Sequence, residues 1–278
     1  NDDRSQVGSV QIYQNINNTW SRIGNILGEH WTHASLGKSI SLSADGSIVL
    51  ISGKSIYQNV NGSWISIGDF AEYNASVSLS ADGSVVAYVV RGGFRILQNI
   101  SGAWTQVGSD IDAEYGSDVE AELGYAIGFA TSGKSVSLSN DGSVVAIGNW
   151  IDDGNGENSG HARIYQNING SWTQIGADIE GEAAGDYAGF SVSLSGDGSV
   201  VAIGAISNDG SDSLGVYKLD RGHVRIFQNI NGSWTQVGSE IEGDGIGDQS
   251  GYSVSLSDDG SIVAIGTIGQ RGTGTDNG

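Results

Sequence analysis

A four-strand unit that occurs five times constrains this chain more than any other feature. Its clearest copy runs from Ser191 to Gly238, where apolar, β-branched segments alternate with short turns at Asp197-Gly198 and Asn231-Gly232. Both turn dipeptides are expected to take positive φ at low cost, as tight turns between twisted strands require. The unit is therefore predicted to be two successive hairpins, with antiparallel strands a, b, c and d.

Both hairpins recur along the chain. The a–b hairpin lies at residues 41–49, 78–86, 137–145, 193–201 and 255–263. The c–d hairpin lies at residues 13–20, 57–64, 97–104, 165–172 and 227–234. A four-stranded unit cannot bury both of its faces alone, so neighbouring units are expected to pack against one another.

The two ends of the chain hold complementary halves of this unit. Residues 10–23 form a c–d pair with no preceding a–b pair, and residues 253–265 form an a–b pair with no following c–d pair. Joining the ends gives five complete units, whereas a linear solenoid would leave two half-built edges. The sequence therefore predicts an all-β, five-bladed β-propeller with four-stranded antiparallel blades, in which N- and C-terminal strands share one blade and close the ring. It is predicted to be a single domain over residues 1–278, with blades at about 253–278 plus 1–24, 37–68, 75–108, 134–176 and 190–238.

Composition limits the classes of function. The chain has no Cys and no Met, which excludes disulfides and suggests a processed protein or an internal segment of a longer one. No apolar run is long enough for membrane insertion, and the net charge of −20 argues against nucleic acid as a partner. Most acidic residues lie in the b–c and d–a connections, which emerge on one face of a propeller. That face is either a solvated surface or a place for cations.

One connection has the pattern of a calcium loop. Its oxygen-bearing side chains alternate along residues 152–158, as in loops that encircle calcium, although a solvated surface loop explains them too. The candidate metal ligands are Asp152, Asp153, Asn155 and Glu157. Poorer candidates are Asn208, Asp209 and Asp212, and the pair His30 and His33.

Acceptor triplets for N-linked glycans recur in the c–d turns. The candidate glycosylation sites are Asn17, Asn61, Asn99, Asn169 and Asn231 in these turns, and Asn74 outside them. The alternative is that the turns themselves require Asn. The first and third copies lose Asn-Gly but keep the triplet, so N-linked glycans are an open expectation.

No catalytic residues are predicted. Strand a should be innermost, and all five copies alternate Ser with Val, Ile or Leu, so no paired carboxylates surround the axis. Without a base beside them, these serines are not nucleophiles. The Trp in each d strand is interpreted as packing between blades.

Residues 185–205 resemble the FG-GAP repeats of integrin-α-like β-propellers. Gly189-Phe190 falls near the family's Phe-Gly element, and Val201–Ala205 stands where the family has Gly-Ala-Pro, with weaker copies at 126–148 and 251–266. The SLSxDGS hairpin followed by VRIYQN-like strands also resembles WD-repeat propellers. The FG-GAP resemblance implies calcium in the a–b loops, but here that loop is reduced to residues 195–199 with one carboxylate, and the Pro is missing. Calcium is therefore not expected there.

These features favour a non-enzymatic extracellular module, secreted or at the cell surface, with a structural or adhesive role. Its expected partners are further copies of itself, in an oligomer or fibre, or another extracellular protein or glycan. Calcium and N-linked glycans are its candidate cofactors. The alternatives are a carbohydrate-binding lectin with sites between blades, which the large differences between the loops disfavour, and a glycan-active enzyme.

Overall fold

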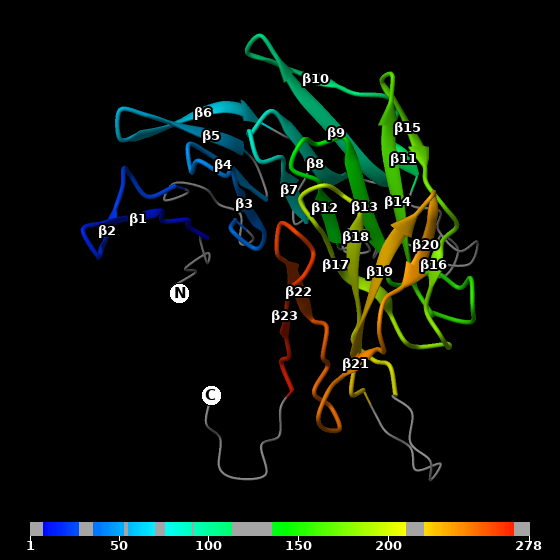
Figure 1. The fold of residues 1–278 in the computed structure, drawn as a ribbon. Helices are drawn as coiled ribbons and strands as arrows, with labels where there is room; N and C mark the ends of the chain where they lie inside the picture. Colours follow the sequence, from blue (N-terminus) through cyan, green and yellow to red (C-terminus); the bar gives the residue numbers. More distant parts are fainter. Residues whose placement is uncertain are drawn as a thin grey trace, which may run out of the picture.

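The computed structural model describes residues 8–27, 36–52, 55–69, 76–90, 92–112, 135–209 and 220–269. Every regular element in these ranges is a β-strand (Figure 1). Within them, no helix has the length and apolarity needed to cross a membrane. The fold is therefore all-β, as the sequence predicted.

Four antiparallel sheets each contain four strands in chain order, a to d. Sheet 1 consists of β3 (Ile40–Leu42), β4 (Ile48–Ile51), β5 (Ser55–Val60) and β6 (Ser63–Asp69). Sheet 2 consists of β7 (Val77–Leu79), β8 (Val85–Val90), β9 (Gly93–Ile100) and β10 (Ala103–Gln106). Sheet 3 consists of β12 (Ser135–Leu138), β13 (Val144–Asn149), β14 (His161–Ile168) and β15 (Ser171–Gln174). Sheet 4 consists of β17 (Ala188–Leu194), β18 (Val200–Ala205), β19 (His223–Ile230) and β20 (Ser233–Gln236).

Three sheets gain a short fifth strand that the sequence did not predict. After strand d the chain returns to pair with the beginning of strand c, in β11 (Ile111–Asp112), β16 (Ile179–Glu180) and β21 (Ile241–Glu242). These strands place an acidic residue opposite the first residue of strand c. Acidic residues were expected only in turns and connections, so this placement is new.

The c–d turns have the predicted geometry. Asn169 and Gly170 take φ of 54° and 86°, the positive pair of a type I′ turn, and Ser101 with Gly102 does the same in sheet 2. The a–b turns differ, because only their glycine has positive φ (71° at Gly198). There the aspartate side chain holds a four-residue loop: Asp197 accepts hydrogen bonds from Ser195 Oγ at 2.8 Å and Ser199 N at 2.9 Å. The prediction of positive φ at both residues is therefore wrong for the Asp-Gly turns.

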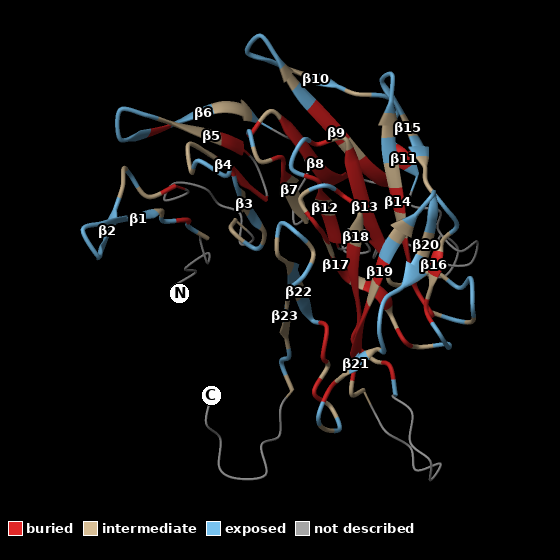
Figure 2. Ribbon diagram, in the orientation of Figure 1, coloured by how far each residue is buried: buried red, intermediate tan, exposed pale blue. Residues whose placement is uncertain are grey.

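The hydrophobic core lies between successive sheets. Ile96 and Phe94 of sheet 2 pack with Val145 of sheet 3, and Ile164 of sheet 3 packs with Ile203 of sheet 4. Figure 2 shows this burial strongest in the second strands, and also in β12 and β17 and the first half of the third strands. Burying each such side chain contributes about 1.5–3 kcal/mol, so the packing between sheets stabilises the arrangement.

Three sets of hydrogen bonds join each sheet to the next. Indole nitrogens donate to a carbonyl oxygen of the preceding unit at 2.9–3.1 Å: Trp64 to Ile23, Trp104 to Ile67, Trp172 to Val107 and Trp234 to Ile175. Serine hydroxyls on the first strands accept from main-chain nitrogens at 3.0 Å: Ser41 from Leu79, Ser78 from Leu138, Ser137 from Leu194 and Ser193 from Leu256. The a–b turns donate to one another at 2.8 Å: Ala44 to Ala81, Ala81 to Asn140, Asn140 to Gly196 and Gly196 to Asp258. The tryptophans therefore act between sheets, as predicted.

The two end hairpins remain separate two-stranded sheets among the described residues. They are β1 (Tyr13–Ile16) with β2 (Thr19–Arg22), and β22 (Ser253–Leu256) with β23 (Val263–Gly266). Figure 1 shows them on opposite sides of an opening, and Figure 2 shows β1, β2 and β22 largely exposed. Trp20 is 68% exposed and Ile40 58% exposed, unlike their counterparts in the other sheets. The shared blade is thus not formed in the described part of the chain.

Candidate metal sites

The predicted calcium loop after β13 does not bring its four candidate ligands together. Asp153 Oδ1 accepts a hydrogen bond from Asn158 N at 2.7 Å. Asn155 Nδ2 donates to the carbonyl oxygens of Gly181 and Glu182, at 2.8 Å each, and Glu157 lies exposed. Of its three carboxylates, only Asp152 belongs to a group of converging His, Asp and Glu side chains among the described residues.

The first group, called cluster A, consists of Asp152, His161 and Glu180. One ligand atom of each lies within 4.8 Å of the others. Asp152 belongs to the loop after β13, His161 begins β14, and Glu180 of β16 lies opposite His161 in the strand register. Three segments that are separate in sequence therefore meet because the fifth strand folds back on β14.

Two atoms of cluster A are buried without hydrogen-bond partners. These are His161 Nδ1 and Glu180 Oε2. Nδ1 lies 3.0 Å from Asp152 Oδ1, but the contact lacks the geometry of a hydrogen bond, and Oδ1 already accepts from Gly154 N at 2.9 Å. Burying such groups unpaired costs about 1–3 kcal/mol each, so these two atoms make cluster A a candidate site for a further ligand.

The carboxylates of Glu180 and Asp178 have pKa values that are shifted in opposite directions. Burial raises the pKa of Glu180, and the negative charges of Asp152 and Asp178 act in the same direction. Burial also raises the pKa of Asp178, but hydrogen bonds from Arg163 at 2.7–2.8 Å and from Gln174 at 2.6 Å outweigh it and leave that pKa below its ordinary value. Asp178 is thus held as a partner of Arg163, and Glu180 remains available to a cation.

The second group, called cluster B, consists of Glu182, His223 and Glu240. His223 begins β19 and is 1% exposed. Its Nδ1 lies 3.8 Å from Glu182 Oε2 and 3.6 Å from Glu240 Oε2, and neither ring nitrogen has a hydrogen-bond partner. Burial, with help from the charge of Arg225, lowers the pKa of His223 to about 4, so the imidazole is neutral at pH 7. A neutral imidazole beside two carboxylates is a donor set that metal cations prefer.

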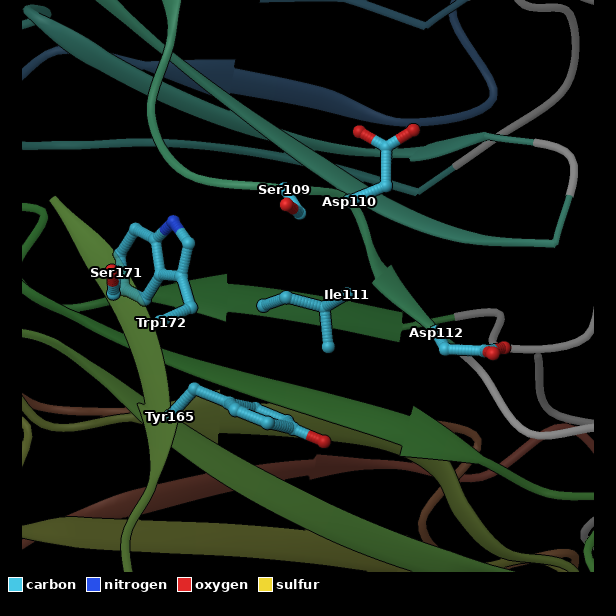
Figure 3. A pocket seen from close by; sticks show the side chains of 7 residues that line it. All are labelled: Ser109, Asp110, Ile111, Asp112, Tyr165, Ser171 and Trp172. Atoms are coloured by element: carbon cyan, nitrogen blue, oxygen red, sulfur yellow. The ribbon is translucent and has the colours of Figure 1, made fainter.

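The described residues also form a shallow pocket between sheets 2 and 3 (Figure 3). Its volume is about 280 Å³, and its lining residues are Ser109, Asp110, Ile111, Asp112, Tyr165, Ser171 and Trp172. Two of its polar side chains already have hydrogen-bond partners. Trp172 donates to Val107 O, and Asp110 accepts from Arg95 at 2.5 and 2.8 Å. The pocket is therefore a weaker candidate than the clusters.

The remaining predicted sites are placed as follows. Asn17, Asn61, Asn169 and Asn231 take positive φ at exposed turn positions. Asn99 instead lies in β9 and accepts from Gly102 N at 2.8 Å, so its triplet is not at the equivalent position. Asn208 is buried and Asp209 is exposed. Asn74, Asp212, His30 and His33 lie outside the described residues. Glycosylation stays a prediction.

Sequence reasoning missed five of the six cluster residues: His161, Glu180, Glu182, His223 and Glu240. A signal was present in the repeats themselves. Two copies of strand c begin Gly-His-x-Arg-Ile, and each is followed after strand d by an acid-Ile-Glu-Gly segment. These two motifs meet because the fifth strand pairs with the beginning of strand c. A strand of two residues is too short to show a hydrophobic periodicity, so the sequence does not reveal this pairing.

Comparisons with known proteins support the fold class. No protein-family model and no curated protein matches this sequence. A solved structure from Bacteroides uniformis, described as a "putative 6-phosphogluconolactonase", is 14% identical with a TM-score of 0.58, over 95% of this chain and 71% of that one. A functionally unknown protein from Desulfotomaculum acetoxidans is 12% identical with a TM-score of 0.54, over 85% of this chain and 63% of that one. At these identities the likeness concerns the fold.

The comparison corrects the function that the sequence favoured. A non-enzymatic, self-associating extracellular module with a structural or adhesive role was predicted from the absence of catalytic residues, the acceptor triplets and the acidic loop face. The protein from Bacteroides uniformis that matches almost the whole chain is instead described as an enzyme. The comparison therefore contradicts the prediction of an adhesive module, because a similar fold occurs in a protein described as a "putative 6-phosphogluconolactonase" and a fold does not by itself determine a role.

Proposed function

We propose that the chain is a five-bladed β-propeller closed by its end hairpins, which binds a divalent transition-metal cation at cluster A. Closure is supported by the three sets of inter-sheet hydrogen bonds, each of which has four members and lacks a fifth among the described residues. A ring would supply it by bringing Trp20 to the carbonyl oxygen of Val237, and Leu42 N to Ser255 Oγ. These positions follow the pattern of the other sheets.

Cation binding rests on one observation: His161 Nδ1 and Glu180 Oε2 are buried, lack hydrogen-bond partners and face Asp152. A dication would satisfy both atoms and offset the two carboxylates. It would also cross-link the b–c loop, strand c and the fifth strand of one blade.

The donor set favours zinc-like ions over calcium. Calcium takes six to eight oxygen ligands, whereas imidazole with carboxylates suits zinc and its neighbours, often with one position left for water. Cluster A offers one nitrogen and two carboxylates. The cation class proposed here therefore differs from the calcium expected from the loop.

Calorimetry with Zn²⁺ and with Ca²⁺ on chelator-treated protein tests this proposal. His161→Gln and Asp152→Asn should each remove a zinc-binding event and the accompanying rise in Tm. Glu157→Gln is the matched control, because it belongs to the expected calcium loop and not to cluster A. Zinc stoichiometry and Tm shift that are unchanged from wild type in folded His161→Gln and Asp152→Asn, or calcium binding that depends on Glu157, would contradict it.

A second candidate function is hydrolysis of a small lactone at this cation. It is favoured by the raised pKa of Glu180 beside the site and by the description of the Bacteroides uniformis protein. A cation held by Asp152 and His161 would supply a Lewis acid and a more acidic water, and in this role Glu180 would act beside the cation as the group that accepts a proton and returns one to the leaving alkoxide. The net reaction adds water across the ring C–O bond of the lactone. The net charge of −20 favours a substrate without a phosphate group.

A pH-stat assay with glucono-δ-lactone and Zn²⁺ tests the second candidate. Hydrolysis above the uncatalysed rate should fall at least tenfold in Glu180→Gln. A rate equal to the uncatalysed one in the zinc-loaded protein would instead support the expectation from sequence that the chain has no catalytic residues.

A further inference from the structure

We propose that cluster B is a second divalent-cation site, formed by Glu182, His223 and Glu240 where sheets 3 and 4 meet. It does not rest on the function proposed for cluster A, because no ligand is shared. Glu182 follows β16 in sheet 3, whereas His223 and Glu240 belong to β19 and to the segment before β21. A cation here would therefore join two sheets, whereas one at cluster A stays within sheet 3.

The distances between His223 Nδ1 and the two carboxylates fit a shared metal ion better than direct hydrogen bonds. Nδ1 of His223 lies 3.6 and 3.8 Å from the two carboxylate oxygens, which is beyond hydrogen-bond length. Donor atoms bonded to zinc at about 2.0–2.2 Å in a tetrahedron lie roughly 3.3–3.6 Å apart. The two separations measured from His223 Nδ1 are therefore close to those expected around a bound zinc ion.

His223 points to a missing ligand independently of the acids. Its side chain is 1% exposed, and both ring nitrogens lack hydrogen-bond partners. A neutral imidazole carries one donor and one acceptor, and leaving either unpaired in the interior is costly. A cation at Nδ1 would use the acceptor without requiring a charged histidine.

Comparison between the repeats shows that the position of Glu240 is paired with an arginine in sheets 2 and 3 but not in sheet 4. In sheets 2 and 3 the arginine two residues into strand c forms a bidentate or forked pair with the aspartate before the fifth strand: Arg95 with Asp110, and Arg163 with Asp178. In sheet 4 the corresponding residues are Arg225 and Glu240. Arg225 instead donates from Nη2 to Glu180 O and lies 5.4 Å from the Phe227 ring centroid. Glu240 is thereby released from the arginine and faces His223.

The local charge favours a dication. Arg225 Nη1 lies 3.8 Å from Glu182 Oε1, so it offsets part of the charge of one carboxylate. Glu182 and Glu240 place two carboxylates beside His223 Nδ1, at 3.8 and 3.6 Å, and like charges this close repel each other. A bound dication would relieve this repulsion.

The test is zinc stoichiometry by calorimetry on the full chain after chelator treatment. The wild-type protein should bind two equivalents, and His223→Gln and Glu240→Gln should each bind one. Glu242→Gln is the matched control and should keep two equivalents. Its carboxylate lies 3.7 Å from Arg221, although its backbone is opposite His223. Circular dichroism and thermal melts would establish that each variant is folded.

The zinc stoichiometry of these variants distinguishes cluster B from cluster A. Loss of one equivalent in His223→Gln and Glu240→Gln, whatever the result for His161→Gln, supports the second site. Unchanged stoichiometry in either folded variant overturns it, as does a wild-type protein whose single equivalent is lost in His161→Gln. Glu240→Gln keeps the test decisive if His223→Gln does not fold.

Discussion

Arg225 donates a hydrogen bond from Nη2 to the main-chain carbonyl oxygen of Glu180. The side chain of Glu180 belongs to cluster A, and Glu182, two residues later, belongs to cluster B. One buried arginine of sheet 4 therefore fixes the segment that supplies a carboxylate to each cluster. The position of this segment depends on contact between neighbouring sheets as well as on its own sheet.

Removing the charge of Arg225 should have two opposite effects. Arg225→Gln leaves Glu180 O without its donor, which should lower stability by about 1–3 kcal/mol. It also removes a positive charge near Glu182, which should strengthen zinc binding at cluster B about tenfold. Urea unfolding and calorimetry measure the two effects on the same sample. Weaker zinc binding in the folded variant would show that Arg225 positions Glu182 more than it competes with the cation.

Gly154 controls the position of the Glu180 carboxylate. A Cβ at this residue would lie 2.6 Å from Glu180 Oε2, the end of a flexible side chain that can move away. Gly154→Ala should therefore weaken zinc binding at cluster A at least tenfold and change stability by less than about 1 kcal/mol. Gly170→Ala does not serve as a control because its φ is +86°, whereas Ser171→Ala, at an exposed position of β15, does. Equal zinc affinity in the alanine variant and wild type would refute this role for Gly154.

Trp20 tests closure of the ring. If it packs as the other strand-d tryptophans do, Trp20→Ala should cost about 3–5 kcal/mol, as large-to-small changes in cores do. If it stays 68% exposed, the cost should be within about 0.5 kcal/mol. Trp104→Ala, whose indole donates to Ile67 O at 3.1 Å, provides the internal reference. A near-zero effect at Trp20 together with a large one at Trp104 would reject closure through this hairpin.

The sequence predicted the fold class and the hairpins because their information is local. Alternation of Val and Ser in strand a and the Asn-Gly turn before Trp172 are each read within a few residues. The a–b turns departed from expectation because the Ser195 and Asp197 side chains supply hydrogen bonds that a two-residue turn would obtain from its backbone. Local chemistry was sufficient to place the turn but not to fix its conformation.

The clusters could not be predicted in the same way. Asp152 was chosen for its neighbours in sequence, yet its partner His161 is nine positions away and Glu180 belongs to a two-residue strand. Of the other predicted ligands, Asp153 and Asn155 satisfy main-chain groups, as Asp and Asn in loops commonly do, and Glu157 lies exposed. His223 could not be predicted as a ligand, because a single histidine at the beginning of a strand belongs to no sequence motif for metal binding. It is identified as a candidate only by its burial without a hydrogen-bond partner.

The a–b turn aspartates should make stability depend on pH in the acidic range. Partial burial raises the pKa of Asp141, but hydrogen bonds from Ser143 and Ser139, at 2.8–2.9 Å, outweigh it and leave the pKa below its ordinary value. At Asp259, hydrogen bonds from Ser257 and Ser261 lower the pKa to about 2. Because the folded-state pKa lies below that of the unfolded chain, this stabilisation is complete above about pH 4 and is lost as the pH falls toward about 2.

Asp141→Asn separates the charge from the shape of the turn. The amide oxygen still accepts hydrogen bonds, so the variant should be less stable than wild type by about 1 kcal/mol at pH 6, and the difference should disappear near pH 2. Urea midpoints measured from pH 6 to pH 2 test this, with Asp244→Asn, an exposed aspartate outside these turns, as the control. A difference between Asp141→Asn and wild type that persists at pH 2 would mean that the turn depends on geometry and not on the carboxylate charge.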